Sequence, residues 1–227
     1  MDPTHCYYPV MLDLRGKKVL FIGGGWETEA KVRGLLGAGA RVTLLSPCEH
    51  PGLEPLAASG GLNWLRRGYR RGDLAGFALA FAHPADRSLN APIAEEARER
   101  GVWLNAVDDP AHCDFILPSV HRQGELVIAV STGGAAPALG VRIRQRLAGE
   151  YGPEYAEYLR LLRSLRPLVL QTYPHDFEAR KAAWYRMVDS PALGLLALGE
   201  PESARRVLLE ALYRHHNHNA SGLEVPS

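Results

Sequence analysis

The chain has 227 residues and carries 26 Lys and Arg against 25 Asp and Glu, so its formal net charge is +1. This balance excludes the strongly basic field on which nucleic-acid binding depends, and any anionic ligand must be held by local clusters of cations. Apolar residues make up 46% of the chain, which excludes disorder of the whole chain. No stretch approaches the ~20 apolar residues that a membrane span needs.

The cysteines and the start of the chain bear on its compartment. Cys6, Cys48 and Cys113 lie far apart and never form a Cys-x-x-Cys pair, so neither a disulfide framework nor a cysteine-rich zinc site is expected. Residues 1–6 lack a basic region followed by an apolar run, so we expect no secretory signal. These features predict a reduced, cytoplasmic protein.

The first predicted elements form a βαβ unit. A continuous apolar run ends in glycines over residues 17–25, which is typical of a strand buried on both faces. A modest helical pattern follows over 27–38, with Gly39 as its stop, and a second strand over 41–46 is closed by Pro47. Strand, glycine turn, helix and strand within about 30 residues indicate a βαβ unit.

The alternation of strands and helices continues to residue 107. A charged amphipathic helix is expected over 90–100, ended by Gly101. This order predicts an α/β protein with a Rossmann-like, mostly parallel sheet, whose ligands lie in the crevice beyond the carboxyl ends of the strands. The further strands are expected over 62–65, 77–82 and 102–107.

From about Cys113 the pattern changes. Two strands are expected over 115–120 and 126–131, joined by the polar turn 121–124. A basic helix follows, and the rest of the chain reads as helical, with Pro167 interrupting or kinking the first helix of that part. The three later helices are expected over 154–170, 177–188 and 201–213.

The glycine turn carries the first functional signal. Gly23-Gly24-Gly25-Trp26-Glu27-Thr28 fits the G-x-G-x-x-G/A pattern at its first two glycines. Residues without Cβ let the backbone approach a pyrophosphate at the N-terminus of a helix. Thr28 is larger than the usual third residue, and a purely structural turn is the alternative. Ser46, at the end of the second strand, offers a hydroxyl where an acidic residue usually holds the ribose.

Several longer segments carry a family resemblance. They are Tyr8 to Leu20 leading into Gly23-Gly24-Gly25, Lys31 in the first helix, Asn105-Ala106-Val107-Asp108-Asp109-Pro110, Cys113 to Ser119, and Ala129 to Pro137 with its Ser-Thr-Gly-Gly element. Over residues 7–150 the chain resembles the precorrin-2 dehydrogenase/sirohydrochlorin ferrochelatase family, the oxidation and iron-insertion module of siroheme synthesis. The helical remainder is compatible with that family in length.

The resemblance implies a function and a domain plan. The expected reaction is the NAD-dependent removal of two hydrogens from precorrin-2 to give sirohydrochlorin, with Fe²⁺ insertion in the same cleft in bifunctional members. The expected partner is a second copy of the chain. The implied domains are an NAD-binding Rossmann-like domain over 1–113, a dimerisation segment over 114–150 that exchanges strands and helix between subunits, a helical domain over 151–214 that forms a wall of the tetrapyrrole cleft, and a disordered tail over 215–227.

Asp108 aligns with the aspartate that the family uses in both reactions. A carboxylate at the carboxyl end of a parallel strand can accept a proton as hydride leaves, or take protons from pyrrole nitrogens as a metal enters. We therefore predict Asp108 as the catalytic and metal-contacting residue, projecting into a hollow that admits a macrocycle. The alternative is a polar turn after a strand. Asp109 and Asp114 are expected to be solvated turn or cap residues, and His112 to be a polar loop residue rather than a metal ligand.

The substrate is expected to meet the Ser-Thr-Gly-Gly segment and the basic helix. Hydroxyls and amides ahead of a helix can receive a substrate carboxylate, although Ser131 or Thr132 can equally be an N-cap. Among Arg142, Arg144 and Arg146 only one or two can meet one ligand, because residues two apart on a helix do not share a face. The predicted substrate-binding residues are Ser131, Thr132, Gly133 and Arg142, and the predicted cofactor-binding residues are Gly23, Gly24, Gly25, Trp26, Glu27, Ser46, Pro47 and His83.

The chain also departs from the family pattern. Where the family usually reads Ala-Ala-Thr-Asp, this chain reads Ala-His-Pro-Ala over residues 82–85. Pro84 supplies no backbone donor, and His83 adds a titratable ring near the expected nicotinamide pocket. Two further functions therefore stay open. One is a non-redox tetrapyrrole- or metal-binding protein, or a chelatase-only member, on a degenerate Rossmann scaffold; the other is a nucleotide-sensing regulatory domain.

Overall fold

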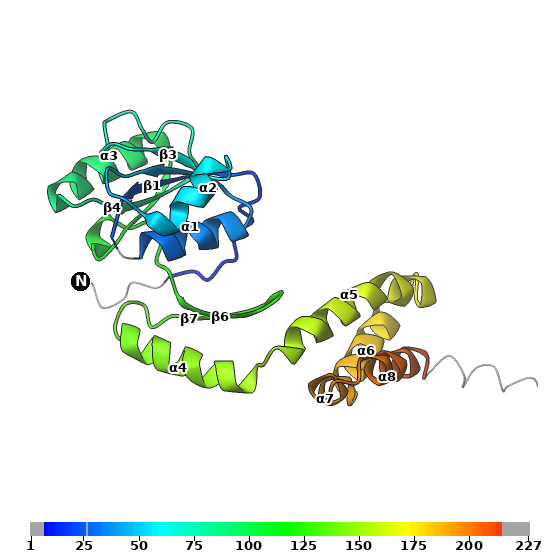
Figure 1. The fold of residues 1–227 in the computed structure, drawn as a ribbon. Helices are drawn as coiled ribbons and strands as arrows, with labels where there is room; N and C mark the ends of the chain where they lie inside the picture. Colours follow the sequence, from blue (N-terminus) through cyan, green and yellow to red (C-terminus); the bar gives the residue numbers. More distant parts are fainter. Residues whose placement is uncertain (1–6, 26, 215–227) are drawn as a thin grey trace, which may run out of the picture. The chain divides into compact units, whose positions relative to one another are not determined.

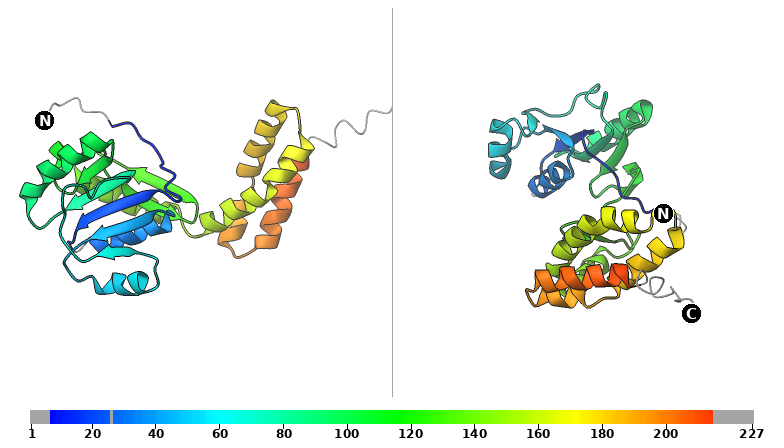
Figure 2. Two further views of the ribbon diagram at one scale, coloured as in Figure 1. Left: turned by 90° about the horizontal axis from the view of Figure 1, so that it is seen from above. Right: turned by 90° about the vertical axis from the view of Figure 1, so that its right-hand side faces the viewer.

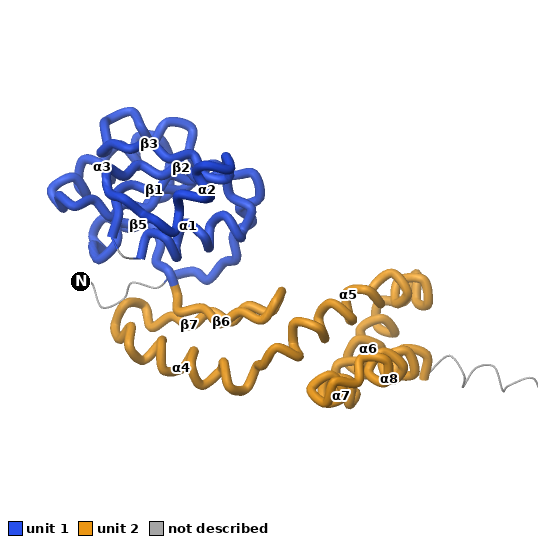
Figure 3. Tube along the Cα trace, in the orientation of Figure 1, with its two compact units in different colours: residues 1–117 blue, residues 118–227 orange. Residues whose placement is uncertain are grey.

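The computed structural model describes residues 7–25 and 27–214, and the chain forms two compact units that divide between Leu117 and Pro118 (Figure 3). The further division predicted at residue 150 remains a prediction. The predicted tail over 215–227 lies outside the described residues, as does Trp26. Within the described ranges, no helix is long and apolar enough to cross a membrane.

The first unit (Figure 1) is built on a five-stranded parallel sheet. Its strand order is β3-β2-β1-β4-β5. This is the Rossmann order: β2 and β3 are added on one side of β1, and β4 and β5 are then added on its other side. The predicted fold class is therefore confirmed. The strands are β1 (Lys18–Gly23), β2 (Arg41–Leu45), β3 (Asn63–Leu65), β4 (Leu79–His83) and β5 (Trp103–Ala106).

Side chains of β1 alternate between two hydrophobic cores, one on each face of the sheet. Leu20 and Ile22 pack with α3 (Asn90–Arg100), whose Ile93 is fully buried. Val19 and Phe21 pack on the other face, where α1 (Thr28–Gly37) and α2 (Glu54–Ala58) lie. Figures 1 and 2 show α1 and α3 on opposite sides of the strands. A strand buried on both faces needs a continuous apolar run, and the sequence provides it.

The second unit begins with the predicted hairpin, which is antiparallel, but the bounds of its first strand differ from the prediction. The strands are β6 (Ser119–Gln123) and β7 (Leu126–Val130), paired from Ser119 opposite Val130 to Gln123 opposite Leu126. The first strand was expected over 115–120, but Phe115 packs against Phe81 in the first unit at a centroid distance of 5.5 Å. The expected turn residues 121–123 belong to β6 instead, because Gly124 (φ 56°) makes a tight two-residue turn with Glu125.

Between the hairpin and residue 214, where the described part of the chain ends, five helices follow one another. The predicted helix ends agree closely, but Pro167 lies inside an unbroken helix because Leu165 and Val169, on either side of it, are buried in the helical core. The short helix α7 was not predicted. The helices are α4 (Pro137–Glu150), α5 (Glu154–Thr172), α6 (Phe177–Val188), α7 (Ala192–Ala197) and α8 (Pro201–Tyr213), and Figure 2 shows α5 to α8 gathered into one group.

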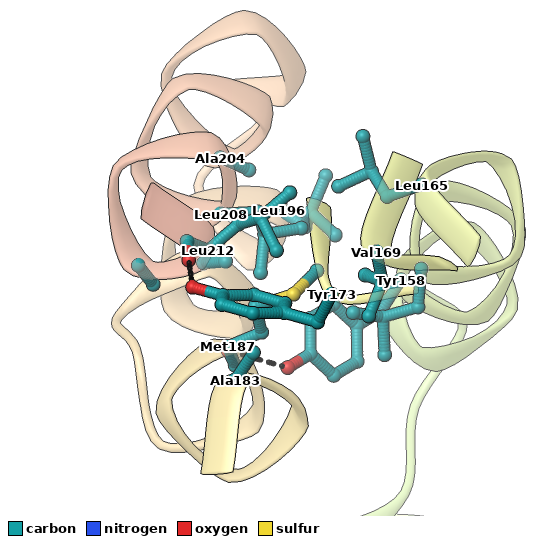
Figure 4. Packing of buried hydrophobic residues seen from close by; sticks show 13 residues of the cluster. Tyr158, Leu165, Val169, Tyr173, Ala183, Met187, Leu196, Ala204, Leu208 and Leu212 are labelled. Atoms are coloured by element: carbon teal, nitrogen blue, oxygen red, sulfur yellow. Dashed lines mark hydrogen bonds between the residues drawn. The ribbon is translucent and has the colours of Figure 1, made fainter. Parts of the chain in front are cut away.

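Two tyrosine hydroxyls join the helices of this core (Figure 4). Tyr173, at the end of α5, donates to the carbonyl of Leu212 in α8 at 2.9 Å. Tyr158 donates to the carbonyl of Met187 in α6 at 3.3 Å. A buried hydroxyl must find an acceptor, and the carbonyls near helix ends lack intrahelical partners. The helical group therefore has an apolar core with directed polar contacts between helices.

Candidate active site

Three consecutive strands of the first unit end at the same edge of the sheet. The order β1-β4-β5 places Gly23, His83 and the segment after Ala106 next to one another, and Gly23 is paired with His83 in the register. Parallel strands with this order open a crevice beyond their carboxyl ends at the β1/β4 switch point. The sequence-predicted glycine turn, His83 and Asp108 therefore belong to one edge.

The glycine turn has no room for side chains. Gly23 has φ 90°, and a Cβ there would run into the backbone carbonyl of His83. A Cβ on Gly25 would lie 2.5 Å from Cε1 of the His83 ring. The predicted residues Gly23, Gly25 and His83 are thus in direct contact, and His83 packs over the turn.

A histidine that the sequence did not single out lies on the other side of the turn. His50 is only 6% exposed, and its Nε2 lies 3.2 Å from Oγ of the fully buried Ser46. A Cβ on Gly24 would lie 2.7 Å from the same Ser46 Oγ. Ser46 Oγ also accepts from the N–H of Cys48, and Pro47 is exposed between them. The Ser46 hydroxyl reaches the glycine turn, but it is engaged with neighbours of its own loop.

The start of α1 offers the features of an anion site. Thr28 opens the helix, and its Oγ1 is buried without a hydrogen-bond partner. Glu27 makes no side-chain cap and instead pairs with Lys31 at 2.6 Å. A glycine turn at the N-terminus of a helix presents backbone N–H groups to a phosphate, and an unsatisfied buried hydroxyl is the kind of group that a ligand can satisfy. The residues present fit the pyrophosphate end of a dinucleotide.

Asp108 lies two residues beyond the end of β5 and has an unusual backbone. Among residues 7–25 and 27–214 it is the one non-glycine residue with positive φ, at 58°. Its side chain is 73% exposed, and Arg87 Nη2 lies 3.6 Å from its Oδ2. An ion pair this exposed contributes no more than ~1 kcal/mol. Asp108 is placed at the expected edge and its side chain is open to solvent, and the predicted hollow around it remains a prediction.

The residues around Asp108 are more ordered than the sequence suggested. Asp109 was expected to be a solvated turn residue, but its Oδ2 accepts from Asn90 Nδ2 at 2.9 Å and lies 2.8 Å from His112 Nδ1. The Asn90 hydrogen bond, with a smaller effect of His112, holds the pKa of Asp109 below its usual range. Asp114 also has a partner, because its Oδ2 accepts from the N–H of Leu104 at 2.8 Å. Both carboxylates are therefore local anchors.

The predicted substrate residues belong to the second unit. Ser131 Oγ accepts from the N–H of Gly133, and Thr132 Oγ1 accepts from the N–H of Ala136, both at 3.1 Å. The N-cap of α4 is Ala136, so neither hydroxyl residue occupies the cap position. Gly133 has φ 62°, and no atom lies within 4 Å of a Cβ built on it. The turn is closed by its own hydrogen bonds and leaves its outer surface open to a ligand.

The arginines of the basic helix α4 differ in whether they have an acidic partner. Arg142 is exposed, whereas Arg146 pairs with Glu150 at 3.1 Å. Arg142 is therefore a better placed cation of α4 for an anionic ligand than Arg146. For metals, the described part of the chain holds no group of three or more His, Cys, Asp or Glu side chains that could form a site. The role of Asp108 as a metal contact remains a prediction, and it concerns Fe²⁺ as a substrate and not as a bound cofactor.

His50, Asn90 and Arg87 are the site residues that the sequence reasoning missed. His50 is buried because the N–H of Gly52 donates to Glu29 Oε1, which returns the loop to α1. Asn90 reaches Asp109 across 19 positions of sequence. Neither contact leaves a spacing pattern. For Asn90 the sequence shows only a polar residue at the start of a helix, and such a residue is usually interpreted as a helix cap.

Known protein families match the chain from residue 10 to residue 212. Three family models match in sequence order: "Putative NAD(P)-binding" over residues 10–119, "Sirohaem biosynthesis protein central" over 123–150, and "Sirohaem synthase dimerisation region" over 154–212. The siroheme synthase of Methylococcus capsulatus is 37% identical over 90% of this chain, and that of Pseudomonas aeruginosa strain UCBPP-PA14 is 35% identical over 95%. The chain covers only 43% and 46% of these two relatives.

A solved structure shares the fold. The structure titled "SirC, precorrin-2 dehydrogenase" superimposes with a TM-score of 0.74 at 24% identity, covering 92% of this chain and all of that one. The fold and the order of matched segments define an NAD(P)-binding Rossmann module followed by a hairpin and a helical region. The three matched models place the chain with the sirohaem synthase proteins, over the part that carries their NAD(P)-binding, central and dimerisation regions.

Proposed function

We propose that the protein removes two hydrogens from precorrin-2 to give sirohydrochlorin, with NAD as hydride acceptor and Asp108 as proton acceptor. The chain spans less than half the length of the siroheme synthases that it matches, and we propose that this part is active by itself. We propose that the protein works in a reducing cytoplasm, where its widely spaced cysteines stay as thiols.

One observation carries the proposal. The glycine turn after β1, His83 at the end of β4 and Asp108 after β5 occupy three neighbouring carboxyl ends of one parallel sheet. A dinucleotide bound at the β1/β4 switch point lies at the same edge as the Asp108 carboxylate. Hydride transfer needs the cofactor and proton removal needs a base close to it. The glycine turn and the Asp108 carboxylate, at one edge of the sheet, supply these two functions.

The chemistry divides between the cofactor and the chain. NAD, when bound, accepts the hydride, and Gly23, Gly25 and the first turn of α1 would hold its pyrophosphate. The substrate must lose a proton together with the hydride, so that the products are sirohydrochlorin, NADH and one proton. Asp108 takes that proton. Its carboxylate carries only a weak ion pair with Arg87 and is therefore free to act as a base.

The second unit supplies groups for a substrate with many carboxylates. The exposed guanidinium of Arg142 can pair with a carboxylate in a bidentate manner. Gly133 and Gly134, both with positive φ, leave an open turn beside the hydroxyls of Ser131 and Thr132. These features support the proposed substrate class, a polyanionic tetrapyrrole.

A homodimer is part of the proposal. The matched dimerisation region contains large apolar side chains that the single chain leaves exposed: Leu170 by 50%, Phe177 by 65%, Tyr185 by 61% and Val188 by 51%. They line one side of α5 and α6 around a groove of about 540 Å³. Exposed aromatic and aliphatic groups of this kind mark protein–protein contacts. A second copy of the chain is the proposed occupant.

One observation favours a second candidate function, a chelatase or tetrapyrrole carrier without redox chemistry. The ring of His50 lies against Gly24 and the ring of His83 against Gly25, and Pro84 follows His83 without an N–H. A turn packed this closely is also what a purely structural glycine segment needs. In this case Asp108 would serve Fe²⁺ insertion alone, by accepting protons from pyrrole nitrogens as the metal enters.

An absorbance time course separates these functions. Precorrin-2, generated enzymatically, is mixed with the purified protein with and without NAD, and Fe²⁺ is added after the first phase. We expect NADH and sirohydrochlorin to appear only with NAD. Conversion to siroheme on adding Fe²⁺ would add the second activity. Precorrin-2 binding with no NADH formed would reject the dehydrogenase and leave the carrier or chelatase.

A further inference from the structure

We propose that Asp109 is a positioning residue for Asp108, and that Asn90 and His112 clamp it in place. The inference deepens the proposed function, because it takes Asp108 as the group that accepts the proton. We call Asn90, Asp109 and His112 the Asp109 clamp.

The need for a clamp comes from the backbone of Asp108. A φ of 58° lies in the left-handed region, which residues with a Cβ adopt reluctantly. The Asp108 side chain cannot enforce this conformation, because it is 73% exposed and its ion-pair distance to Arg87 is 3.6 Å. The neighbouring residues must therefore impose it. Unfavourable backbone conformations persist only where the surroundings over-determine them, and they cluster at active sites.

Asp109 is held through both its backbone and its side chain. Its N–H donates to the carbonyl of Ala106, and its own carbonyl accepts from the N–H of His112, both at 3.1 Å. Its Oδ2 accepts from Asn90 Nδ2 at 2.9 Å and from His112 Nδ1 at 2.8 Å. A carboxylate only accepts, so the proton of the His112 ring lies on Nδ1. With Cys113 Sγ, which donates to the same Asp109 carbonyl at 3.4 Å, five contacts fix the residue that directly follows Asp108.

Asn90 ties this loop to the rigid part of the unit. It is the first residue of α3 and is 2% exposed, and the same helix buries Ile93 and Ala94 against the sheet. Its Oδ1 is buried without a hydrogen-bond partner. An apolar residue would fill this position without leaving a polar atom unpaired. What the asparagine adds is the amide that holds Asp109.

A plain polar turn does not account for these contacts. In a turn after a strand, the aspartate side chain bonds within its own few residues. Here Asp109 joins the loop after β5 to the start of α3, 19 positions away, and also to His112 three positions on. The part of the loop that the clamp leaves free is Asp108 itself. The contacts therefore hold the backbone that carries the exposed carboxylate.

Two variants of the full chain separate position from charge. Asp109→Ala removes both side-chain contacts, whereas Asp109→Asn keeps an Oδ1 that accepts from Asn90 and His112. We expect kcat for NADH formation from precorrin-2 to fall roughly 10- to 100-fold in Asp109→Ala, with KM for NAD unchanged. Asp109→Asn should stay within about threefold of the unmodified protein. Asp189→Ala, an exposed acid of the second unit, is the matched control.

Hydrogen exchange gives a readout that does not depend on activity. The Asp109 and His112 amides should exchange faster in Asp109→Ala and keep their protection in Asp109→Asn, while β1 amides stay protected in both. Equal losses of kcat in the two variants, or unchanged exchange in Asp109→Ala, would overturn the clamp. An unmodified protein that forms no NADH overturns the proposed function instead, and the exchange experiment still tests the clamp.

Discussion

Two loops of the first unit differ in the burial and hydrogen bonding of the carboxylate associated with each. The loop over residues 69–74 is anchored by Glu96, whose side chain is fully buried. Glu96 accepts from the Tyr69 hydroxyl at 2.5 Å, from the N–H of Gly72 at 2.9 Å, and from Arg100 Nε at 2.6 Å. The loop over residues 106–113 leaves Asp108 mostly exposed, in a left-handed backbone conformation.

The difference separates a structural carboxylate from an available one. Burial by itself raises the pKa of Glu96, but its hydrogen bonds, led by that of Tyr69, lower the pKa below the ordinary value. All its acceptor capacity is used to hold the chain. The side chain of Asp108 makes only the long ion pair with Arg87, while its neighbour Asp109 takes the anchoring role. A carboxylate with unfilled acceptor positions and a fixed backbone is the one that can meet a substrate.

The largest expected stability effect is at Glu96. Glu96→Gln replaces an acceptor by an NH₂ group that faces N–H donors, so we expect the free energy of unfolding of the first unit to fall by about 3 kcal/mol. Hydrogen exchange of the Leu20–Ile22 amides reports this unit alone. Glu99→Gln, on the exposed part of the same helix, should change it by less than about 0.5 kcal/mol. Equal effects of the two variants would contradict the structural role of Glu96.

Acid should remove the advantage that Glu96 gives. Its folded-state pKa is lowered, so its contribution is fully present above the unfolded value of about 4.3 and is lost as the pH falls through the folded value. The stability difference between the unmodified protein and Glu96→Gln should therefore be constant near neutral pH and shrink below about pH 4.3. Acid titrations of both proteins by circular dichroism measure it. A difference that grows on acidification would reverse the assigned direction.

The helical unit should respond more weakly to loss of one polar contact. Tyr173→Phe removes the hydroxyl that donates to the Leu212 carbonyl, and we expect a loss of about 1 kcal/mol in the free energy of unfolding. Arg186 also reaches that carbonyl, at 3.4 Å, which limits the cost. Tyr185→Phe, at a ring that is 61% exposed, is the control and should be neutral. Urea unfolding of the purified variants provides the comparison.

The smallest effect tests the backbone of Asp108. Asp108→Gly and Asp108→Ala remove the same carboxylate, but glycine adopts φ 58° freely and alanine does not. We expect the glycine variant to be more stable than the alanine variant by about 0.5–1 kcal/mol. Thermal melting of the two variants measures the difference. A more stable alanine variant would show that residue 108 is not held in the left-handed region.

Much of the fold could be predicted from the sequence, because its signals are local. The apolar run through Ile22, the run through Ala82 and the stop at Gly101 (φ 66°) each specify an element without reference to the rest of the chain. The predicted bounds of the first hairpin strand were wrong because a run of apolar residues does not show that Phe115 packs on Phe81 instead of entering a strand. Pairing with a distant aromatic ring decided that boundary.

The candidate site was predictable only in part, for the same reason. The glycine turn and Asp108 follow strands, so strand order alone brings them to one edge. The burial of His50 depends on a loop closed by Glu29, and the environment of Asp109 depends on Asn90. Contacts between residues about 20 positions apart leave no periodic trace, and a left-handed aspartate reads the same as any other aspartate. These details required the structure.

The most direct test of the account compares the unmodified protein with Asp108→Ala in the same assay. NADH formation from precorrin-2 should fall by roughly 10²–10⁴-fold in the variant. Its melting temperature should stay close to that of the unmodified protein, because the exposed side chain makes only a long, solvent-exposed ion pair with Arg87. A variant that keeps a tenth or more of the unmodified rate would contradict Asp108 as the proton acceptor.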